Sequence, residues 1–254
     1  MTAPRESSHV MFGVQGRVIT SITLRATMGR KRALLFAIPP LILLLVTVLI
    51  KLAHPDDASW PSQVLGIFGF TVVLPLTALI IGTSVLGAEV DEGSIVHLLA
   101  TPVPRSVVIW SKYAVAAVLT MAFVAVPELL AGLIATGGLT KLAVGLFVGA
   151  LAGSVMYNAV FVMISVLTTR AIAYGLAYVV VWEGLVGNFV SGARLLSVGQ
   201  YSLGVANAIA HDAKNLNASQ GLSTSVVMGA IVTVAAIVIA VRALSAFSLK
   251  GDAV

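Results

Sequence analysis

The sequence lacks cysteine and holds unusually few charged residues. Of its 254 residues none is cysteine, only 10% are Asp, Glu, Lys or Arg, and 59% are hydrophobic. A disulfide framework, a metal thiolate site and a thiol nucleophile are therefore excluded, and redox chemistry has no support. Because soluble domains carry roughly a quarter charged residues, the scarcity of charge indicates a membrane protein.

Long apolar segments recur along the chain. A helix needs about 20 mostly apolar residues to cross the hydrocarbon layer, and within a helix the backbone polar groups bond to one another. The predicted fold class is therefore all-α, a polytopic membrane protein whose transmembrane domain covers 33–247. Its six predicted transmembrane helices are 33–53, 63–86, 113–136, 142–167, 171–190 and 224–247.

Positive charge is distributed unevenly between the two faces of this domain. Six basic residues precede the first span: Arg5, Arg17, Arg25, Arg30, Lys31 and Arg32. Cytoplasmic loops retain Lys and Arg, so we expect a cell (inner or cytoplasmic) membrane protein with both termini cytoplasmic, 1–32 before the spans and 248–254 as a tail. This topology explains the formal net charge of +5, and no nucleic-acid partner is expected.

Two segments have the pattern of membrane-associated helices that do not span. Within 10–32, apolar residues recur every four positions from Val10 to Ile22, which predicts an amphipathic interfacial helix. The alternative is a basic topogenic tail with no other role. Residues 191–223 are moderately apolar with scattered Gly and Ser, which predicts short helices at, or dipping into, the outer leaflet and partly covered by protein.

Proline and glycine predict local geometry in two of the spans. Pro39 and Pro40 remove backbone donors from the first span, so we expect it to bend or break there. Gly145, Gly149 and Gly153 recur at four-residue spacing in the fourth span. They leave one helix face bare, which predicts close packing against another helix, in this chain or in a second subunit.

Few polar side chains lie within the spans. Glu128 and Glu183 are the clear ionisable residues at membrane depth, and Tyr157 and Asn158 are weaker candidates. Ionisable groups at this depth are costly and often functional, so all four are candidates for a substrate path. The alternative is a neutral carboxyl bonded to a neighbouring helix, or an ion pair between Glu183 and Arg194.

One internal connection, 87–112, is rich in acids and contains the stretch "AEVDEGSIVHLLATPVPRSVVIWSK". Asp91 and Glu92 suit a helix N-terminus, apolar residues follow at i, i+3 and i+4 spacing, and prolines end the element. The pattern predicts a short amphipathic helix on the cytoplasmic side. Beyond it, we expect Ser106 to cap the third span and the Lys112 ammonium to reach the headgroups.

This stretch resembles the cytoplasmic loop of the type 2 class of ABC exporter permeases. The resemblance rests on the spacing of Glu89, Glu92, Gly93, Leu98, Leu99, Pro102, Arg105 and Lys112. Two positions depart from the family pattern, Ser94 in place of Thr and Ser111 in place of Gly. Chain length, span number and the apolar segment before the last span agree with the same family.

The resemblance implies the permease subunit of an ATP-driven exporter, whose loop helix is the coupling helix that enters a groove of a separate ATPase subunit. The residues expected to contact that partner are Glu89, Asp91, Glu92, Gly93, Ser94, Ile95, Leu98, Leu99, Pro102 and Arg105. The alternative is that the acids only solvate an inner loop. The chain holds no G-x-x-x-x-G-K-[ST] phosphate loop, so ATP and Mg are expected on the partner, with no cofactor, metal or catalytic site on this chain.

Six spans enclose too little for a full pathway. We therefore expect two permease chains, identical or related, with two ATPase subunits in the lipid bilayer. Two other functions remain open, an ion-driven carrier and a polytopic membrane enzyme. A carrier usually shows an internal repeat, and an enzyme needs a nucleophile with a base, or a metal set. The four histidines all lie outside the spans and supply none of these.

Overall fold

The computed structural model describes part of the chain and is helical there, with no strand among the described residues. The described residues are 20, 23–24, 27, 29–55, 57, 59–91, 104–186, 193–210, 216 and 218–251. Most of the predicted interfacial helix and residues 92–103 of the predicted coupling segment lie outside them, so both helices stay predictions.

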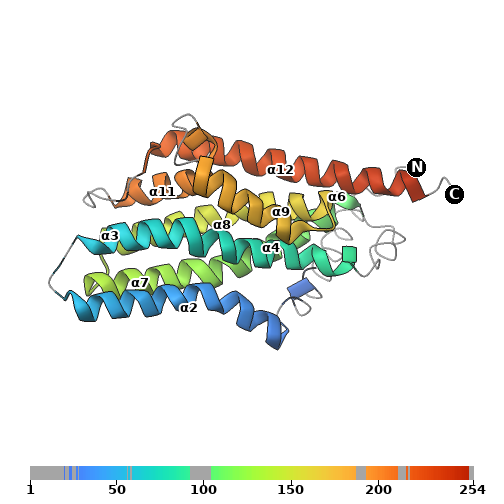
Figure 1. The fold of residues 1–254 in the computed structure, drawn as a ribbon. Coiled ribbons are helices and arrows are strands. Elements are labelled where there is room, and N and C mark those ends of the chain that lie inside the picture. The colour runs from blue at the N-terminus through green and yellow to red at the C-terminus, as the bar shows by residue number, and fades with distance from the viewer. Residues whose placement is uncertain are drawn as a thin grey trace, which may run out of the picture.

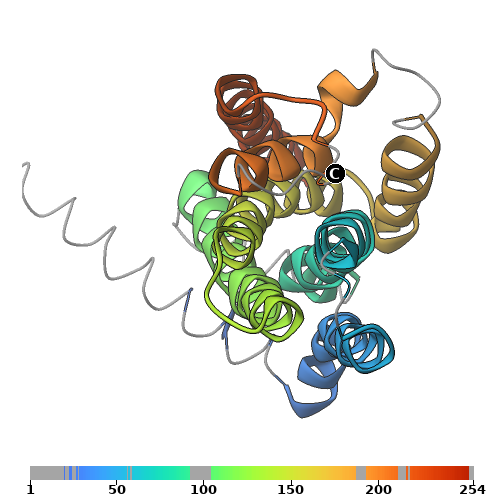
Figure 2. The same cartoon turned by 90° about the vertical axis from the view of Figure 1, so that its left-hand side faces the viewer.

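Five helical stretches in the described residues are long and apolar enough to cross a membrane. They lie side by side in Figure 1 and form a bundle when viewed end-on in Figure 2. The stretches are α2 (Arg30–Ala53); α3 (Trp60–Val64), η1 (Leu65–Val73) and α4 (Leu74–Asp91) in one run; α6 (Arg105–Thr120), η2 (Met121–Ala125) and α7 (Val126–Thr136) in another; α8 (Lys141–Leu167); and α12 (Leu222–Gly251). The prediction of an all-α, multi-pass membrane fold is confirmed.

The remaining predicted span, 171–190, corresponds to a shorter apolar helix. Its described part consists of α9 (Ala171–Ala177) followed by η3 (Tyr178–Val186). The apolar portion, Ala171–Gly184, falls below the length of the five long helices. Residues 187–190 lie outside the described part of the chain, so the sixth span stays a prediction.

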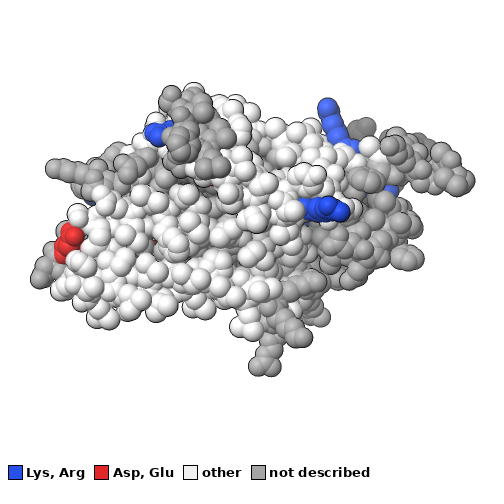
Figure 3. Space-filling view, viewed as in Figure 1, with Lys and Arg blue, Asp and Glu red and all other residues white. Residues whose placement is uncertain are grey.

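Helix α8 is the centre of the bundle. It contacts α4, α6, α7, α9, α11 and α12, and 67% of its most apolar window is buried, against 22% for α2 and 28% for α12. The two peripheral helices expose rows of Leu, Val and Ile side chains. Figure 3 shows an uncharged band across the middle of one face, with the charged side chains toward the two ends. Such a surface suits contact with lipid.

The prolines of α2 do not interrupt it. Pro39 and Pro40 lie inside one continuous helix from Arg30 to Ala53, and Figure 1 shows this helix bent toward its N-terminal part. Neighbouring backbone groups absorb the lost donors in membrane helices, so a bend is tolerated where a break would expose polar groups.

Lys112 lies inside the bundle, which corrects the prediction that it reaches the headgroups. The side chain is 1% exposed, and its Nζ donates a hydrogen bond to the carbonyl oxygen of Val85 at 2.7 Å. The third span begins at Arg105, after Pro104, so Ser106 lies within α6 and does not cap it. This earlier start of the helix carries Lys112 one to two turns into the protein, beside α4.

In its described part, the segment before the last span contains two short helices. These are the 3₁₀ turn η4 (Ala193–Leu196) and α11 (Val198–Ile209). Helix α11 packs against α8, α12 and η1, and Tyr201, Ser202 and Ala206 on it are fully buried. Helix α11 is therefore part of the protein core, and a position of the segment at the outer leaflet stays a prediction.

Candidate functional site

Gly145, Gly149 and Gly153 of α8 form the surface against which α11 packs. A Cβ atom placed on Gly149 would lie 2.7 Å from both the Ala206 Cβ and the Ser202 carbonyl oxygen. At Gly145 it would lie 2.6 Å from the Ala206 carbonyl oxygen, and at Gly153 2.6 Å from the Ser202 hydroxyl. Only a residue without a side chain allows this approach of two helices. The neighbour that the sequence left open is thus α11 of the same chain.

Glu183 on η3 is bonded to the first turn of α11. The side chain is 8% exposed. Its Oε1 accepts from the Val198 backbone N–H at 2.9 Å and from the Tyr178 hydroxyl at 3.2 Å, and its Oε2 accepts from the Ser197 hydroxyl. A carboxylate at a helix N-terminus satisfies donors that lack partners within the helix. Glu183 therefore joins the fifth apolar segment to the start of α11.

Ser197 completes this junction. It is the N-cap of α11, and its hydroxyl oxygen accepts from the Gln200 backbone N–H at 3.1 Å while donating to Glu183. Tyr157 of α8 is fully buried behind the junction, and a Cβ on Gly199 would lie 3.2 Å from both its hydroxyl and Glu183 Oε2. Helix α8, η3 and the start of α11 therefore meet at this junction.

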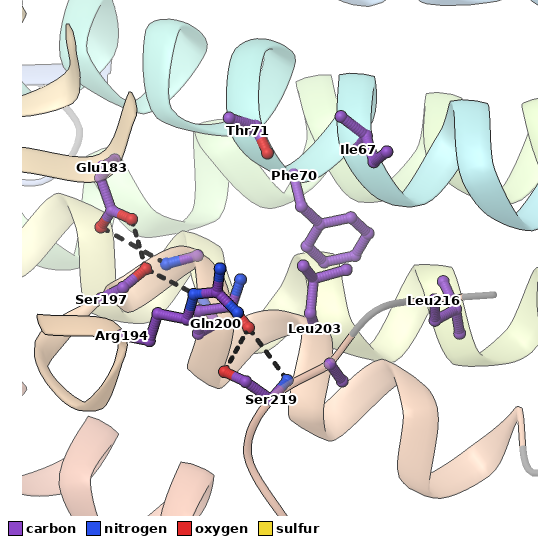
Figure 4. A pocket seen from close by; sticks show the side chains of 12 residues that line it. Ile67, Phe70, Thr71, Glu183, Arg194, Ser197, Gln200, Leu203, Leu216 and Ser219 are labelled. Carbon is purple, nitrogen blue, oxygen red and sulfur yellow. Dashed lines mark hydrogen bonds between the residues drawn. The ribbon is translucent and has the colours of Figure 1, made fainter. Parts of the chain in front are cut away.

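A cavity of about 580 Å³ opens beside this junction. It lies between η1, η3, η4, α11 and the residues before α12, as Figure 4 shows. Two of these walls, η1 and η3, are π-helical, a geometry that recurs at functional sites. The residues that line it are Ile67, Phe70, Thr71, Glu183, Arg194, Ser197, Gly199, Gln200, Leu203, Leu216, Ala218 and Ser219.

The cavity has a polar side and an apolar side. Arg194, Ser197 and Gln200 bring hydrogen-bonding groups from η4 and α11. Gln200 Oε1 accepts from the Ser219 backbone N–H at 3.1 Å and from its hydroxyl at 2.8 Å, which fixes the segment before α12 against α11. The opposite wall is formed mainly by Ile67 and Phe70 of η1, as Figure 4 shows.

Glu128 lies apart from this cavity. It is on α7, fully buried, and neither carboxyl oxygen has a hydrogen-bond partner among the described residues. The carboxyl group is packed against Gly69 of η1 so closely that a side chain at Gly69 would overlap it. A buried polar group without a partner is costly and rare in native proteins. Glu183 is therefore hydrogen-bonded to several donors, whereas Glu128 has no hydrogen-bond partner among the described residues.

Asn158 joins helices away from the cavity. Its Nδ2 donates to the Thr120 hydroxyl at 2.8 Å and to the Ser154 carbonyl oxygen at 2.8 Å. The first bond connects α8 to α6, as polar residues often do between membrane helices. Of the four path candidates, Glu183 lines the cavity, Tyr157 stands behind it, and Glu128 and Asn158 lie elsewhere. A substrate-path role for any of them stays a proposal.

Sequence reasoning missed Gln200 and Thr71 and treated Arg194 only as a counter-ion. For Gln200 the available signal was that 191–223 is too apolar for an exposed loop, which favours contact of its polar residues with the protein. Arg194 and Glu183 line the same cavity, and an ion pair between them stays a prediction. In the described part of the chain, no three His, Asp or Glu side chains gather as a metal site would require.

The predicted coupling residues are only partly placed. Glu89 and Asp91 belong to the last turn of α4, and Arg105 is the first residue of α6. The others, Glu92, Gly93, Ser94, Ile95, Leu98, Leu99 and Pro102, lie outside the described residues. The structure thus describes the two helices from which the segment emerges, held together by Lys112 and Val85.

Comparison with known proteins gives one family match. A family model described as "ABC-2 family transporter protein" matches residues 30–192, from the start of α2 to beyond the end of η3. No curated protein and no solved structure matches the chain.

Proposed function

This chain belongs to the ABC-2 family of transporter proteins, and from that membership we propose that it is the permease subunit of an ATP-driven exporter. Members of this family are membrane transport components rather than catalytic proteins. The observation that carries the proposal is the match over 30–192, which covers four of the five long apolar helices. Of the twelve residues that line the cavity, the four on η1 and η3 lie within the matched region, and the other eight follow it in the chain.

We place ATP hydrolysis on a separate subunit. The printed sequence contains no G-x-x-x-x-G-K-[ST] motif, and that motif supplies the backbone cradle for phosphates and the hydroxyl that binds Mg²⁺. The complex then contains two ATPase subunits with bound ATP and Mg, and two permease chains, identical or related. Each permease contributes one bundle to the pathway.

The ATPase docks at the segment that connects α4 to α6. Acids at its start and apolar residues after them suit a cleft that buries the apolar face and orients the acids. The hydrogen bond from Lys112 to Val85 supports this role, because it ties together the two helices on which the segment stands. A movement imposed on the segment is then passed to both helices.

We orient the protein with this docking end in the cytoplasm. The start of α6 and the C-terminal end of α12 lie at one end of the bundle, and α3 and α11 extend toward the other (Figure 1). The excess of Lys and Arg before the first span supports the same orientation in the cell membrane, with both termini cytoplasmic. The cavity is then in the outer half of the protein.

An ion-driven carrier is the second candidate, and Glu128 is the observation that favours it. Buried acids at membrane depth occur in proton relays, and this one has no hydrogen-bond partner in the described residues. The opposing observation is the family match.

Purification and reconstitution separate the two candidates. The full chain, tagged at its C-terminus, is purified from its native membrane and the co-eluting proteins are identified. We expect an ATPase subunit in the complex and, in proteoliposomes, cargo movement that needs ATP and stops with a non-hydrolysable analogue. Cargo movement by the chain alone, driven by a proton gradient without ATP, would contradict the proposal and support the carrier.

A further inference from the structure

We propose that the cavity between η1 and α11 binds the acidic headgroup of an amphiphilic molecule, with the apolar part of that molecule against η1. This assignment rests on the proposed export function, because it names the chemical class of the cargo. It follows from the hydrogen-bonding groups and the apolar side chains that line the cavity.

The acceptors of the cavity are largely occupied. Glu183 accepts from Ser197, Tyr178 and the Val198 backbone, so its carboxylate is directed at the start of α11. Gln200 Oε1 accepts twice from Ser219. A backbone N–H can only donate, so the bond from Ser219 N fixes which end of the Gln200 amide is the oxygen.

Donors are what the cavity still offers. With its oxygen held by Ser219, the Gln200 amide presents its NH₂ group, which donates to none of the described residues. Arg194 also lines the cavity, and its guanidinium is a planar group with five N–H donors and no acceptor. A donor-rich site of this kind favours a phosphate or carboxylate.

The opposite wall favours hydrocarbon. Ile67 and Phe70 of η1 face the cavity, with Leu203 and Leu216 at its side, as Figure 4 shows. The volume, about 580 Å³, falls within the roughly 300–1,000 Å³ typical of small-molecule sites. A sugar or an inorganic ion leaves the apolar wall in contact with water, whereas an organic cation is repelled by Arg194. An acidic amphiphile satisfies both sides.

Binding of hexyl phosphate to the purified protein in nanodiscs tests this assignment, because the probe has both parts and stays in water. Inorganic phosphate is the probe without a chain, and hexyltrimethylammonium has the opposite charge. We expect hexyl phosphate to bind at least about tenfold more tightly than either, since burial of methylene groups and charge-assisted hydrogen bonds each contribute that much.

Two variants locate the site. Arg194→Gln removes the charge, and Gln200→Glu keeps the acceptor for Ser219 while replacing the amide donor with a carboxylate. Each is expected to weaken hexyl phosphate binding by about tenfold or more. Arg242→Gln is the matched control, because it removes the same charge from an exposed position on α12. Melting temperatures check that all three variants are folded.

Other outcomes overturn the assignment. Equal hexyl phosphate affinity in Arg194→Gln, Gln200→Glu and Arg242→Gln places the binding elsewhere. Equal affinity for inorganic phosphate and hexyl phosphate would show that the apolar wall does not contribute to binding. A phospholipid that co-purifies with the wild type, is lost in Arg194→Gln and is not displaced by hexyl phosphate identifies a resident lipid instead of cargo. Binding as expected without ATP-driven transport contradicts the export function and leaves the site assignment standing.

Discussion

The Lys112 ammonium donates to the carbonyl oxygen of Val85 across 2.7 Å, and this bond joins α6 to α4 at the end of the bundle from which 92–103 emerges. Lys112 is 1% exposed. A buried charge is costly unless it is hydrogen-bonded. Its position therefore stabilises one arrangement of the two helices.

Replacing Lys112 tests that role. Lys112→Met keeps the length and apolar stem of the side chain but removes the donor, so the Val85 carbonyl loses that bond. We expect a loss of about 1–3 kcal/mol in stability, visible as a lower melting temperature. Arg242→Met on the exposed face of α12 is the control. A variant that melts like the wild type would show that the bond adds nothing.

The contact between Gly69 and Glu128 predicts a compensating pair of substitutions. Gly69→Ala puts a methyl group into the space of the Glu128 carboxyl, and we expect it to destabilise the protein by about 1–3 kcal/mol. In a Glu128→Ala background the space is free, so the same substitution should cost much less. A double-mutant cycle measures the difference. Additive effects would mean that the two residues are not in contact in the membrane.

Glu183 is expected to hold the start of α11. Glu183→Gln keeps one acceptor oxygen and replaces the other with an amide donor, so Ser197 and the Val198 N–H compete for the remaining one. Local opening of the first turn should become about tenfold more frequent. Hydrogen exchange of α11 peptides measures it. Glu128→Gln, without these bonds, is the control, and equal exchange in both variants would contradict the role.

Gly149→Ile is expected to separate α8 from α11. The new side chain meets the Ala206 Cβ and the Ser202 carbonyl oxygen, and overpacking of this kind costs about 1–3 kcal/mol or more. The yield of folded protein after solubilisation and its melting temperature give the effect. Gly138→Ile is the matched control, since nothing lies within 4 Å of a Cβ there. Similar yields for the two variants would refute the packing assignment.

The coupling segment gives a prediction at the level of the complex. Leu98→Asp forces a carboxylate into an apolar contact and should release the ATPase subunit. Replacing both Glu89 and Glu92 by Ala should lower transport strongly while the amount of protein inserted in the membrane changes little. Retained ATPase, hydrolysis rate and transport are measured on each purified complex. Ser106→Asp, exposed on α6, is the control for added charge. Full partner binding and full transport in both variants would show that the segment is only a solvated connection, without a coupling role.

The sequence predicted the elements of this fold better than their contacts. Five of the six predicted spans correspond to long apolar helices, because length and hydropathy are local properties. Packing was harder to predict: in a chain that is apolar on every face, periodicity does not separate lipid contact from protein contact. The sequence therefore predicted that protein partly covers the segment of α11, but it did not identify Gly149 as the surface against which α11 packs.

The candidate site was predictable only in its polar members. Glu183 was identified because a carboxyl at membrane depth is rare, but the same rule selected Glu128, which lies outside the cavity. The cavity itself joins Ile67, Glu183 and Gln200 from three separate parts of the chain. Their meeting depends on tertiary packing. Lys112 was misplaced for a related reason, since its burial depends on α6 beginning at Arg105.

The π-helical stretch η1 changes how this span should be compared with those of relatives. A π-helix bonds each residue to the fifth residue along, so each of its turns holds more residues than a turn of α-helix. Side chains before and after η1 are therefore out of phase with a single helical period. A helical wheel drawn through the whole span would mix the cavity-facing positions of Ile67 and Phe70 with positions on other sides of the helix. The insertion or deletion of one residue near Leu65–Val73 would then rotate one half of the span relative to the other, while its apolar segment changes in length by only that one residue.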